Sequence, residues 1–166
     1  MTKSSAKSNQ GMSYTRKKYA RGSPPSGVVK FTMGEPSEDY QYKVELVALE
    51  KTVIKGSALE SARMASNRVM NTKYDRSGYF LRIRVYPHEI IRSHKFMSFA
   101  GADRLSQGMR NAFGKPIARA ARIDNGQVVV SISTDEDKLD DAKIALKRAG
   151  AKLPLKYRIE VHESSN

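Results

Sequence analysis

Apolar and polar residues alternate along several short segments of this chain, and the alternation predicts β-strands. The most regular segment is residues 79–86, in which every second residue is apolar and faces one side. This pattern is typical of a strand that is buried on one face only. The other face carries two arginines between two aromatic residues, namely Phe80, Arg82, Arg84 and Tyr86.

Five further segments have strand character. Val28–Met33 and the longer stretch Tyr40–Ile54 lie in the first third of the chain, and Leu155–Val161 lies near its end. Between them, Asp124-Asn125-Gly126 separates two apolar segments, and Asn-Gly tolerates the positive φ of a tight turn. We therefore predict a β-hairpin made of Pro116–Ile123 and Gln127–Ser133.

Apolar residues at helical spacing predict two main helices, the first of which opens at Ser57. Ser57 and Glu60 have the spacing of a capping box, in which the two side chains satisfy free amides at the helix start. Arg63 and Arg68 are expected to face outward. The inward face is expected to hold Leu59, Ala62, Ala65 and Val69.

The second predicted helix spans Asp135–Ala149 and stops at Gly150. Its acids crowd the N-terminal end, whereas Lys147 and Arg148 lie at the C-terminal end, as the helix dipole favours. Its inward residues are predicted to be Leu139, Ala142, Leu146 and Ala149.

The order of these elements predicts an α+β fold with a split βαβ-like unit at its end. We expect a single domain of mixed antiparallel strands and two main helices over residues 27–166. Residues 1–26 hold six Lys and Arg and no acid, among Ser, Gly, Asn and Pro. They are predicted to form a basic, flexible N-terminal extension.

The net charge is the most informative property of the composition. Thirty Lys and Arg oppose seventeen Asp and Glu, which leaves +13 on 166 residues. Self-repulsion of this size destabilises a compact state, so a polyanionic partner is expected, and nucleic acid is the first candidate. A membrane is not expected, since no apolar run approaches the ~18 residues of a spanning helix and no signal peptide is seen. The absence of cysteine excludes disulfides and thiolate sites and fits a cytoplasmic protein.

The positive charge is unevenly distributed along the chain. From Arg82 to Arg122, nine Lys and Arg oppose two acids, whereas from Ile123 to Asp141 one Lys opposes six acids. We expect one cationic face, with the C-terminal helix as an acidic, solvent-facing counterweight. Aromatics also alternate with cations near Tyr14, a mixture that suits RNA through stacking and phosphate pairing. The predicted RNA-binding residues are Arg16, Lys17, Lys18, Arg21, Arg82, Arg84, Arg92, Lys95, Arg119 and Arg122.

The segment 97–116 mixes glycines, large apolar residues and cations, and it allows two interpretations. Ala102, Leu105, Met109 and Ala112 have the spacing of a buried amphipathic helix, although Gly108 in its middle costs on the order of 1 kcal/mol. The alternative is a long functional loop that orders on a partner. In that case Arg104, Arg110 and Lys115 reach phosphates.

Catalytic and metal-binding motifs are missing. His88-Glu89 begins like the zinc motif H-E-x-x-H, but Arg92 occupies the fifth position and Pro87 argues against the required helix. Phosphate-binding glycine loops and Ser nucleophile elbows are also absent. We therefore expect no enzyme activity, no metal and no cofactor.

Several motifs occur in an order that resembles one known family. Around the 97–116 segment they are Val85-Tyr-Pro-His88, Ile91-Arg92, Lys95, Ala100-Gly-Ala-Asp-Arg-Leu-Ser106, Gly108-Met-Arg110 and Ala112-Phe-Gly-Lys-Pro116. Elsewhere they are Tyr14-Thr-Arg-Lys17, Phe31-Thr-Met-Gly34, Ala58-Leu-Glu-Ser-Ala-Arg63, Ala120-Ala-Arg122 and Lys152-Leu-Pro154. Over roughly residues 14–162 the chain resembles the large-subunit ribosomal protein family L-ten-e, the archaeal and eukaryotic counterpart of bacterial L-sixteen.

The resemblance implies a hammerhead-type α+β domain that is a structural constituent of the cytoplasmic large ribosomal subunit. It implies large-subunit rRNA and neighbouring ribosomal proteins as partners, with no homo-oligomer. It also implies that the 97–116 loop, with Arg104, Arg110 and Lys115, points toward tRNA acceptor arms near the A and P sites and the peptidyl transferase centre. The alternative is a free RNA-binding or ribosome-assembly factor, and a hydrolase using His88 and Glu89 is a remote third.

Overall fold

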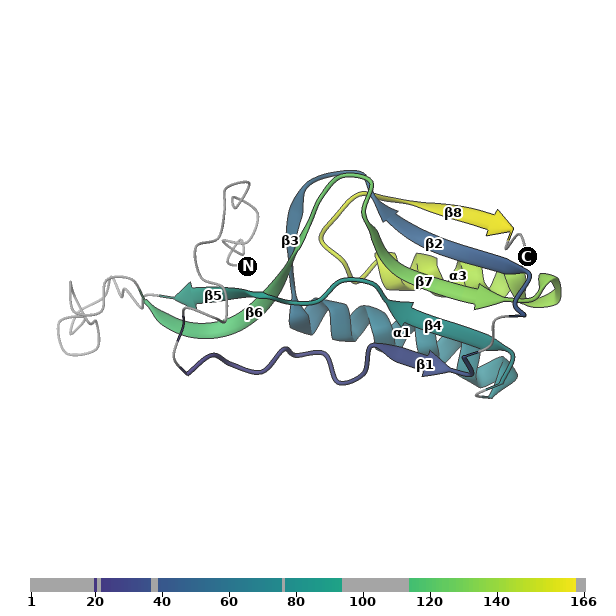
Figure 1. Cartoon of the computed structure of the whole chain (residues 1–166), viewed down its shortest axis with the longest axis horizontal. Coiled ribbons are helices and arrows are strands. Elements are labelled where there is room, and N and C mark those ends of the chain that lie inside the picture. The colour runs from purple at the N-terminus through teal and green to yellow at the C-terminus, as the bar shows by residue number, and fades with distance from the viewer. Residues whose placement is uncertain (1–19, 21, 37–38, 76, 94–113, 164–166) are drawn as a thin grey trace.

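The strands form two sheets that lie end to end along the long axis of the molecule (Figure 1). The computed structural model describes residue 20 and residues 22–36, 39–75, 77–93 and 114–163. The five-stranded sheet has the order β1 (Thr32–Gly34), β4 (Tyr79–Ile83), β7 (Val128–Thr134), β2 (Tyr42–Ala48) and β8 (Tyr157–Glu163). The three-stranded sheet has the order β3 (Thr52–Lys55), β6 (Lys115–Ile123) and β5 (Glu89–Ser93).

Two helices cover one face of the five-stranded sheet and leave the other face open (Figure 1). They are α1 (Gly56–Tyr74) and α3 (Leu139–Gly150), the latter preceded by the short 3-10 helix η3 (Glu136–Lys138). The core lies between the helices and the sheet, and Leu46, Leu59, Leu81, Ile132 and Leu146 are fully buried in it. The predicted α+β class with two main helices is confirmed.

A pair of antiparallel chain segments joins the two sheets. β3 pairs with β6 in the small sheet, and β2 pairs with β7 in the large one. Both segments bend at the same level, where the Ala48 amide donates to the Gln127 carbonyl and the Gly126 amide donates to the Ala48 carbonyl, at 3.0 and 2.8 Å. The two segments therefore pass from one sheet to the other together.

This arrangement corrects several predictions about the strands. The expected hairpin of Pro116–Ile123 and Gln127–Ser133 is wrong, because β6 and β7 pair with different partners in different sheets. Gly126 does adopt a positive φ of 78°, but the turn is a corner between sheets. Likewise, the predicted strand Tyr40–Ile54 is two strands, β2 and β3, which are separated by the bend that lies against the Gly126 turn. The strands at the two ends were also misplaced, since β1 begins at Thr32 and β8 at Tyr157.

The end of the chain forms the expected split βαβ unit. β7 and β8 are both antiparallel to β2, which lies between them, so β7 and β8 run parallel and α3 connects them. α3 ends at Gly150, one residue beyond the predicted end at Ala149, and it begins at Leu139 and not at the predicted Asp135. Glycine is required at position 150, because a Cβ there would collide with the ring of Tyr157.

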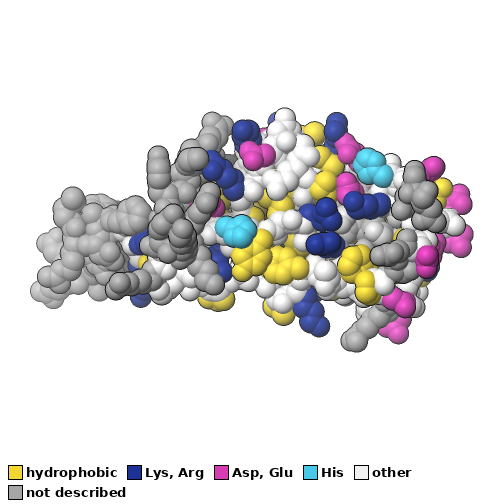
Figure 2. Space-filling view, in the orientation of Figure 1, with side chains coloured by type: hydrophobic (Ala, Val, Ile, Leu, Met, Phe, Trp, Pro, Cys, Tyr) yellow, Lys and Arg dark blue, Asp and Glu magenta, His cyan; other side chains and the backbone are white. Residues whose placement is uncertain are grey.

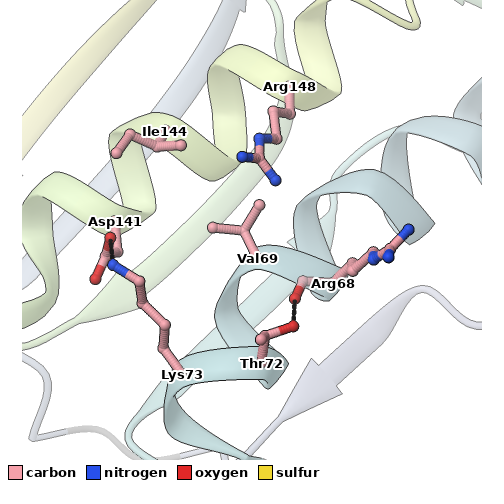
Figure 3. Close-up of a pocket in the computed structure, with 7 residues that line it drawn as sticks. All are labelled: Arg68, Val69, Thr72, Lys73, Asp141, Ile144 and Arg148. Carbon is pink, nitrogen blue, oxygen red and sulfur yellow. Dashed lines mark hydrogen bonds and ion pairs between the residues drawn. The ribbon is translucent and has the colours of Figure 1, made fainter.

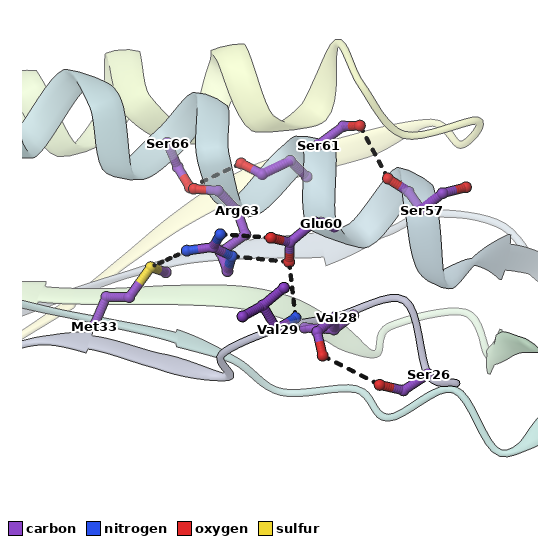
Figure 4. Close-up of polar contacts among 10 residues, drawn as sticks. Ser26, Val28, Val29, Met33, Ser57, Glu60, Ser61, Arg63 and Ser66 are labelled. Carbon is purple, nitrogen blue, oxygen red and sulfur yellow. Dashed lines mark hydrogen bonds and ion pairs between the residues drawn. The ribbon is translucent and has the colours of Figure 1, made fainter. Parts of the chain in front are cut away.

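The first turn of α1 is held in a different way from the predicted capping box. The cap position is Lys55, and it makes no side-chain capping bond. Glu60 instead accepts the Val29 amide at 3.1 Å and pairs with Arg63, whose Nη1 also contacts the Met33 sulfur (Figure 4). Hydrogen bonds from Arg63 and Val29, the Arg63 bond being the stronger cause, hold the pKa of Glu60 below its usual range.

Arg63 was therefore wrongly predicted to face outward, since its side chain is only 14% exposed. The segment before β1 also packs tightly on this helix start. A Cβ on Gly56 would overlap the carbonyl oxygen of Ser26, so only glycine allows the approach. Leu59, Ala62 and Val69 are buried as predicted, whereas Ala65 is only half-buried.

One carboxylate locks α1 to α3. Asp141 accepts hydrogen bonds from Lys73 Nζ and the Tyr74 hydroxyl, both at 2.5 Å. These two bonds, with Lys73 the larger cause, lower the pKa of Asp141, and the same contact raises the pKa of Tyr74. The lock joins the two elements that cover the core.

We expect the Asp141→Asn variant to be less stable than the wild type at neutral pH. A lowered folded-state pKa means that the carboxylate stabilises the fold above its unfolded pKa, ~3.9, and that this stabilisation is lost as the pH falls through the folded-state value. The stability difference should therefore shrink below about pH 4. Urea unfolding between pH 2.5 and 7 measures it.

Asp140→Asn is the matched control, because that side chain is 93% exposed and meets only Lys143. It should change stability little at any pH. A deficit in Asp141→Asn that stays constant down to pH 2.5 would contradict the ionic lock.

Candidate nucleic-acid interface

On the open face of the five-stranded sheet, positively charged side chains lie at the end of β4. Outward side chains of β4 alternate with the buried Tyr79, Leu81 and Ile83, as the sequence predicted. Arg82 lies opposite Ser131 of β7 on this face, and both Arg82 and Arg84 are exposed. Within the described part of the chain, neither arginine forms an ion pair. Their charge is therefore available to a partner.

Aromatic rings lie beside these arginines. The rings of Phe31 and Tyr86 stack with centroids 5.3 Å apart and planes 25° apart, and His88 lies 4.7 Å from Tyr86. Near the end of β4, Figure 2 shows dark blue side chains next to yellow ones and a histidine. Tyr86 is 42% exposed, whereas Phe31 is half-buried and also packs against the core. An exposed aromatic ring next to guanidinium groups is what a single-stranded base stacks on.

Phe31 was missed by sequence reasoning as a member of this group. It precedes β1, whereas Tyr86 follows β4, and the two meet because those strands pair across the sheet. The Ile83 amide donates to the Phe31 carbonyl at 2.8 Å, which fixes this register. Only knowledge of the pairing would have indicated the contact.

On the open face, β2 and β8 carry charges of both signs that pair with one another. Glu45 and Glu160 are direct cross-strand partners in β2 and β8. Lys43 pairs with Glu45 at 2.6 Å, Arg158 pairs with Glu160 at 2.5 Å, and His162 lies 3.6 Å from Glu160. Because these charges compensate one another, the uncompensated cations of this face lie on and just beyond β4.

Two predicted RNA-binding arginines of β6 lie on opposite sides of the three-stranded sheet. Arg122 is exposed and is paired in register with Val53. Arg119 is only 7% exposed, and its Nη2 donates to the Ser23 hydroxyl at 2.9 Å. Arg119 thus attaches the segment before β1 to the sheet, whereas Arg122 is open to a partner.

Arg92 and Lys115 frame the segment between β5 and β6. Arg92 is half-buried and donates to the Gly114 carbonyl at 2.9 Å. Lys115 is exposed and lies opposite Ser93 as the first residue of β6. The predicted loop 97–116 was therefore too long at this end, because Lys115 and Pro116 belong to a strand. Arg16, Lys17, Lys18, Arg21, Lys95, Arg104 and Arg110 lie outside the described residues, as does the predicted helix at 102–112.

Two basic segments, the N-terminal extension and the chain between β5 and β6, join the described fold at the same end of the molecule. Ser23, which follows the first, contacts Arg119 of β6, and the second runs between Ser93 and Lys115 at the tip of the small sheet (Figure 1). The acids gather at the opposite end (Figure 2). At that end, the pKa of Tyr42 is raised, mainly by the negative charge of Glu136 and to a smaller extent by burial and by Glu163.

No metal centre is formed among the described residues, where no group of three His, Cys, Asp or Glu could hold an ion. His88 is exposed and its ring contacts that of Tyr86 at a tilt of 51°, while Glu89 is buried at the start of β5. The described helices include none that is long and apolar enough to cross a membrane.

An exposed arginine–aromatic surface with a strong charge polarity on an α+β domain is typical of nucleic-acid-binding proteins. A family model described as ribosomal protein L16p/L10e matches residues 9–160. The chain therefore belongs to the ribosomal protein L16p/L10e family, whose members are structural components and not enzymes.

Relatives from three archaeal organisms are similar over most of their length, and each is named large ribosomal subunit protein uL16. The protein of Hyperthermus butylicus is 48% identical over 160 residues, which cover 96% of this chain and 89% of the relative. That of Staphylothermus marinus is 48% identical, with 90% and 86% covered. That of Methanococcus maripaludis strain S2 is 44% identical, with the same coverage. The resemblance deduced from the motifs is confirmed.

We predict that Arg119 and Arg122 have separable roles. Arg119→Ala should lower stability by about 1–3 kcal/mol, because a buried hydrogen bond to Ser23 is lost, and should speed proteolysis of residues 20–26. Arg122→Ala should leave stability within about 0.5 kcal/mol and weaken RNA binding. Urea unfolding, limited proteolysis and RNA titration distinguish the two. Equal stability losses in both variants would contradict the assignment.

Proposed function

We propose that this protein is a structural constituent of the large ribosomal subunit that binds large-subunit rRNA through the arginine–aromatic surface of Phe31, Arg82, Arg84, Tyr86 and His88. Membership of the ribosomal family supports the assembly, and the relatives' names supply the subunit. The surface itself supplies the contact chemistry. Arginine pairs with phosphate oxygens in a bidentate geometry, and aromatic rings stack on bases.

The uncompensated charge of Arg82 and Arg84 is the observation that supports this role most strongly. On the same sheet face, Lys43 and Arg158 are each held by a glutamate at 2.6 and 2.5 Å. Arg82 and Arg84 have no such carboxylate within the described fold. A phosphate backbone along β4 would neutralise them, and Arg122 extends the same chemistry to the small sheet.

The charge polarity favours a fixed orientation on the RNA. Both basic segments are attached at the small-sheet end, and the acids lie at the other end. A polyanion attracts one end and repels the other, which selects one docking direction. The small-sheet end would then point into the RNA and the acidic end away from it.

In this orientation the two strand ends that flank residues 94–113, Ser93 of β5 and Lys115 of β6, lie at the RNA-facing end. We assign to the chain between them, together with Lys115, the placement of Arg104, Arg110 and Lys115 near the tRNA acceptor arms, at the peptidyl transferase centre. The position of its base supports this role, because β5 and β6 hold the two ends of the segment side by side. The protein would position tRNA while the RNA carries out the chemistry.

We predict that Arg82→Ala/Arg84→Ala weakens rRNA binding and reduces its salt dependence. Each lost phosphate contact lowers the slope of log K against log salt by roughly 0.7–0.9, so the double variant should lose about 1.4–1.8. Fluorescence titration at several salt concentrations measures the slope. An unchanged slope would remove this surface from the interface.

Arg158→Ala is the control for that experiment. It lies on the same sheet face, but Glu160 already holds its guanidinium. Its effect should be smaller than that of Arg82→Ala alone. If the protein were instead a free assembly factor, the wild type would leave the large subunit in a high-salt wash.

Replacing Arg104, Arg110 and Lys115 together by Ala should leave incorporation into large subunits intact but weaken tRNA handling. The reason is that these cations lie in or beside the segment assigned to tRNA and not on the arginine–aromatic surface. Subunit occupancy and tRNA binding are measured side by side. Lys115→Ala alone, on the first residue of β6, controls for strand disruption. Loss of incorporation in the triple variant only would show that the loop is an anchor.

A further inference from the structure

A groove lies between the two helices, on the side of the molecule away from the open sheet face. Its volume is about 440 Å³, and it is lined by Arg68, Val69, Thr72, Lys73, Asp141, Ile144 and Arg148. Val69 and Ile144 provide apolar surface between the helices (Figure 3). Ile144 is 45% exposed, so the groove is open to a partner.

The acid in this groove is already neutralised. Asp141 accepts both the Lys73 ammonium and the Tyr74 hydroxyl at 2.5 Å. The Thr72 hydroxyl is also engaged, because it donates to the Arg68 carbonyl at 2.6 Å. The Lys73 end of the groove is thus a balanced ion pair with no net charge to attract a ligand.

The other end is cationic. Arg148 extends from α3 toward α1 above Val69, and Arg68 leaves α1 at the end away from Lys73 (Figure 3). Both arginines are exposed, and neither forms a hydrogen bond or ion pair through its guanidinium within the described residues. Both guanidinium groups are therefore available to an anion at this end of the groove.

The structure places Arg68 of α1 beside the cationic end that the sequence predicted for α3. The helix as a whole was expected to be an acidic, solvent-facing counterweight. Its acids do occupy η3 and the first turn of α3, but Lys147 and Arg148 make the last turn cationic beside Arg68 of α1. The helix layer is therefore acidic at one end and basic at the other.

We propose that the α1–α3 groove binds the phosphate backbone of a second rRNA segment, through Arg68 and Arg148. The proposal rests on the proposed function, because the occupant is the RNA of the same assembly. Arginine at both positions matches the planar, bidentate pairing that phosphate oxygens favour. The apolar surface of Val69 and Ile144 would lie against the ribose. The protein would thus be held between two RNA segments, one on each side.

Two single-cysteine variants test the location directly, since the chain contains no cysteine of its own. Thr72→Cys places a tethered hydroxyl-radical cleavage probe in the groove. Ser133→Cys places the same probe on the open sheet face, opposite Phe80. Each full-length variant is incorporated into large subunits, and the rRNA cuts are mapped. We expect strong cuts from both probes, in two RNA segments that do not overlap.

A charge variant provides the second readout. Arg68→Ala/Arg148→Ala should reduce the salt slope of rRNA binding by roughly 1.4–1.8 and suppress the cuts from the Thr72→Cys probe, but not those from Ser133→Cys. Lys147→Ala/Lys152→Ala is the matched control. It removes the same charge from the same end of α3 without touching the lining of the groove, and it should leave the groove cuts in place.

The outcomes separate the two proposals. Cuts from Ser133→Cys alone would overturn the groove proposal and leave the proposed function standing. Absence of cuts from both probes in incorporated protein would overturn both. Cross-linking of Thr72→Cys to a neighbouring protein, without RNA cuts, would assign the groove to a protein partner and also overturn the proposal.

Discussion

The paired bend of two antiparallel segments is the constraint on which the rest of the structure depends. β2 with β3 and β7 with β6 pass from the large sheet into the small one side by side, and the backbone bonds between Ala48 and the 126–127 turn hold the bend. The small sheet consists of three strands, and Ile54, Ala121 and Ile123 join it to the main core. Its orientation follows from this continuous pairing and from the packing of α1, which begins directly after β3. Because β5 and β6 carry the ends of the 94–113 segment, the bend also determines where that segment leaves the fold.

The electrostatic arrangement depends on which cations already have partners. Lys43, Lys73, Arg63 and Arg158 each meet a carboxylate and contribute to the fold. Arg119 contributes in the same way through Ser23. Arg82, Arg84 and Arg122 remain available on the sheets, as do Arg68 and Arg148 on the helix side. Net charge alone does not make this distinction. A protein with the same composition but different pairing would present a different surface to RNA.

Sequence patterns predicted the parts of the fold that depend on local periodicity. The alternation over residues 79–86 identified β4 and its exposed face, and the strand–helix–strand order identified the split βαβ unit. Asn125-Gly126 correctly indicated a positive φ, but a turn signal does not say which strands pair beyond it, and the hairpin was wrong. Ser57 and Glu60 had the spacing of a capping box. Glu60 instead accepts a hydrogen bond from the amide of Val29, which lies 31 residues away in the sequence.

In the candidate site, too, the residues that follow from the pattern of one strand were predictable, and those that depend on long-range pairing were not. Arg82 and Arg84 followed from the alternation of a single strand. The burial of Arg119 did not, because its inward direction depends on the register of β6 against β5 and on the position of Ser23. Phe31 and the α1–α3 groove also depend on elements that are distant in sequence. Family motifs identified the kind of partner, but the three-dimensional pairing was needed to assign residues to faces.

A cryo-EM map of the large ribosomal subunit that contains this protein tests the central claim most directly. The account predicts rRNA phosphates within hydrogen-bonding distance of the Arg82 and Arg84 guanidinium groups, and a base or ribose against the Phe31–Tyr86 stack. An open sheet face that is exposed to solvent, or covered by another protein without RNA, would contradict it.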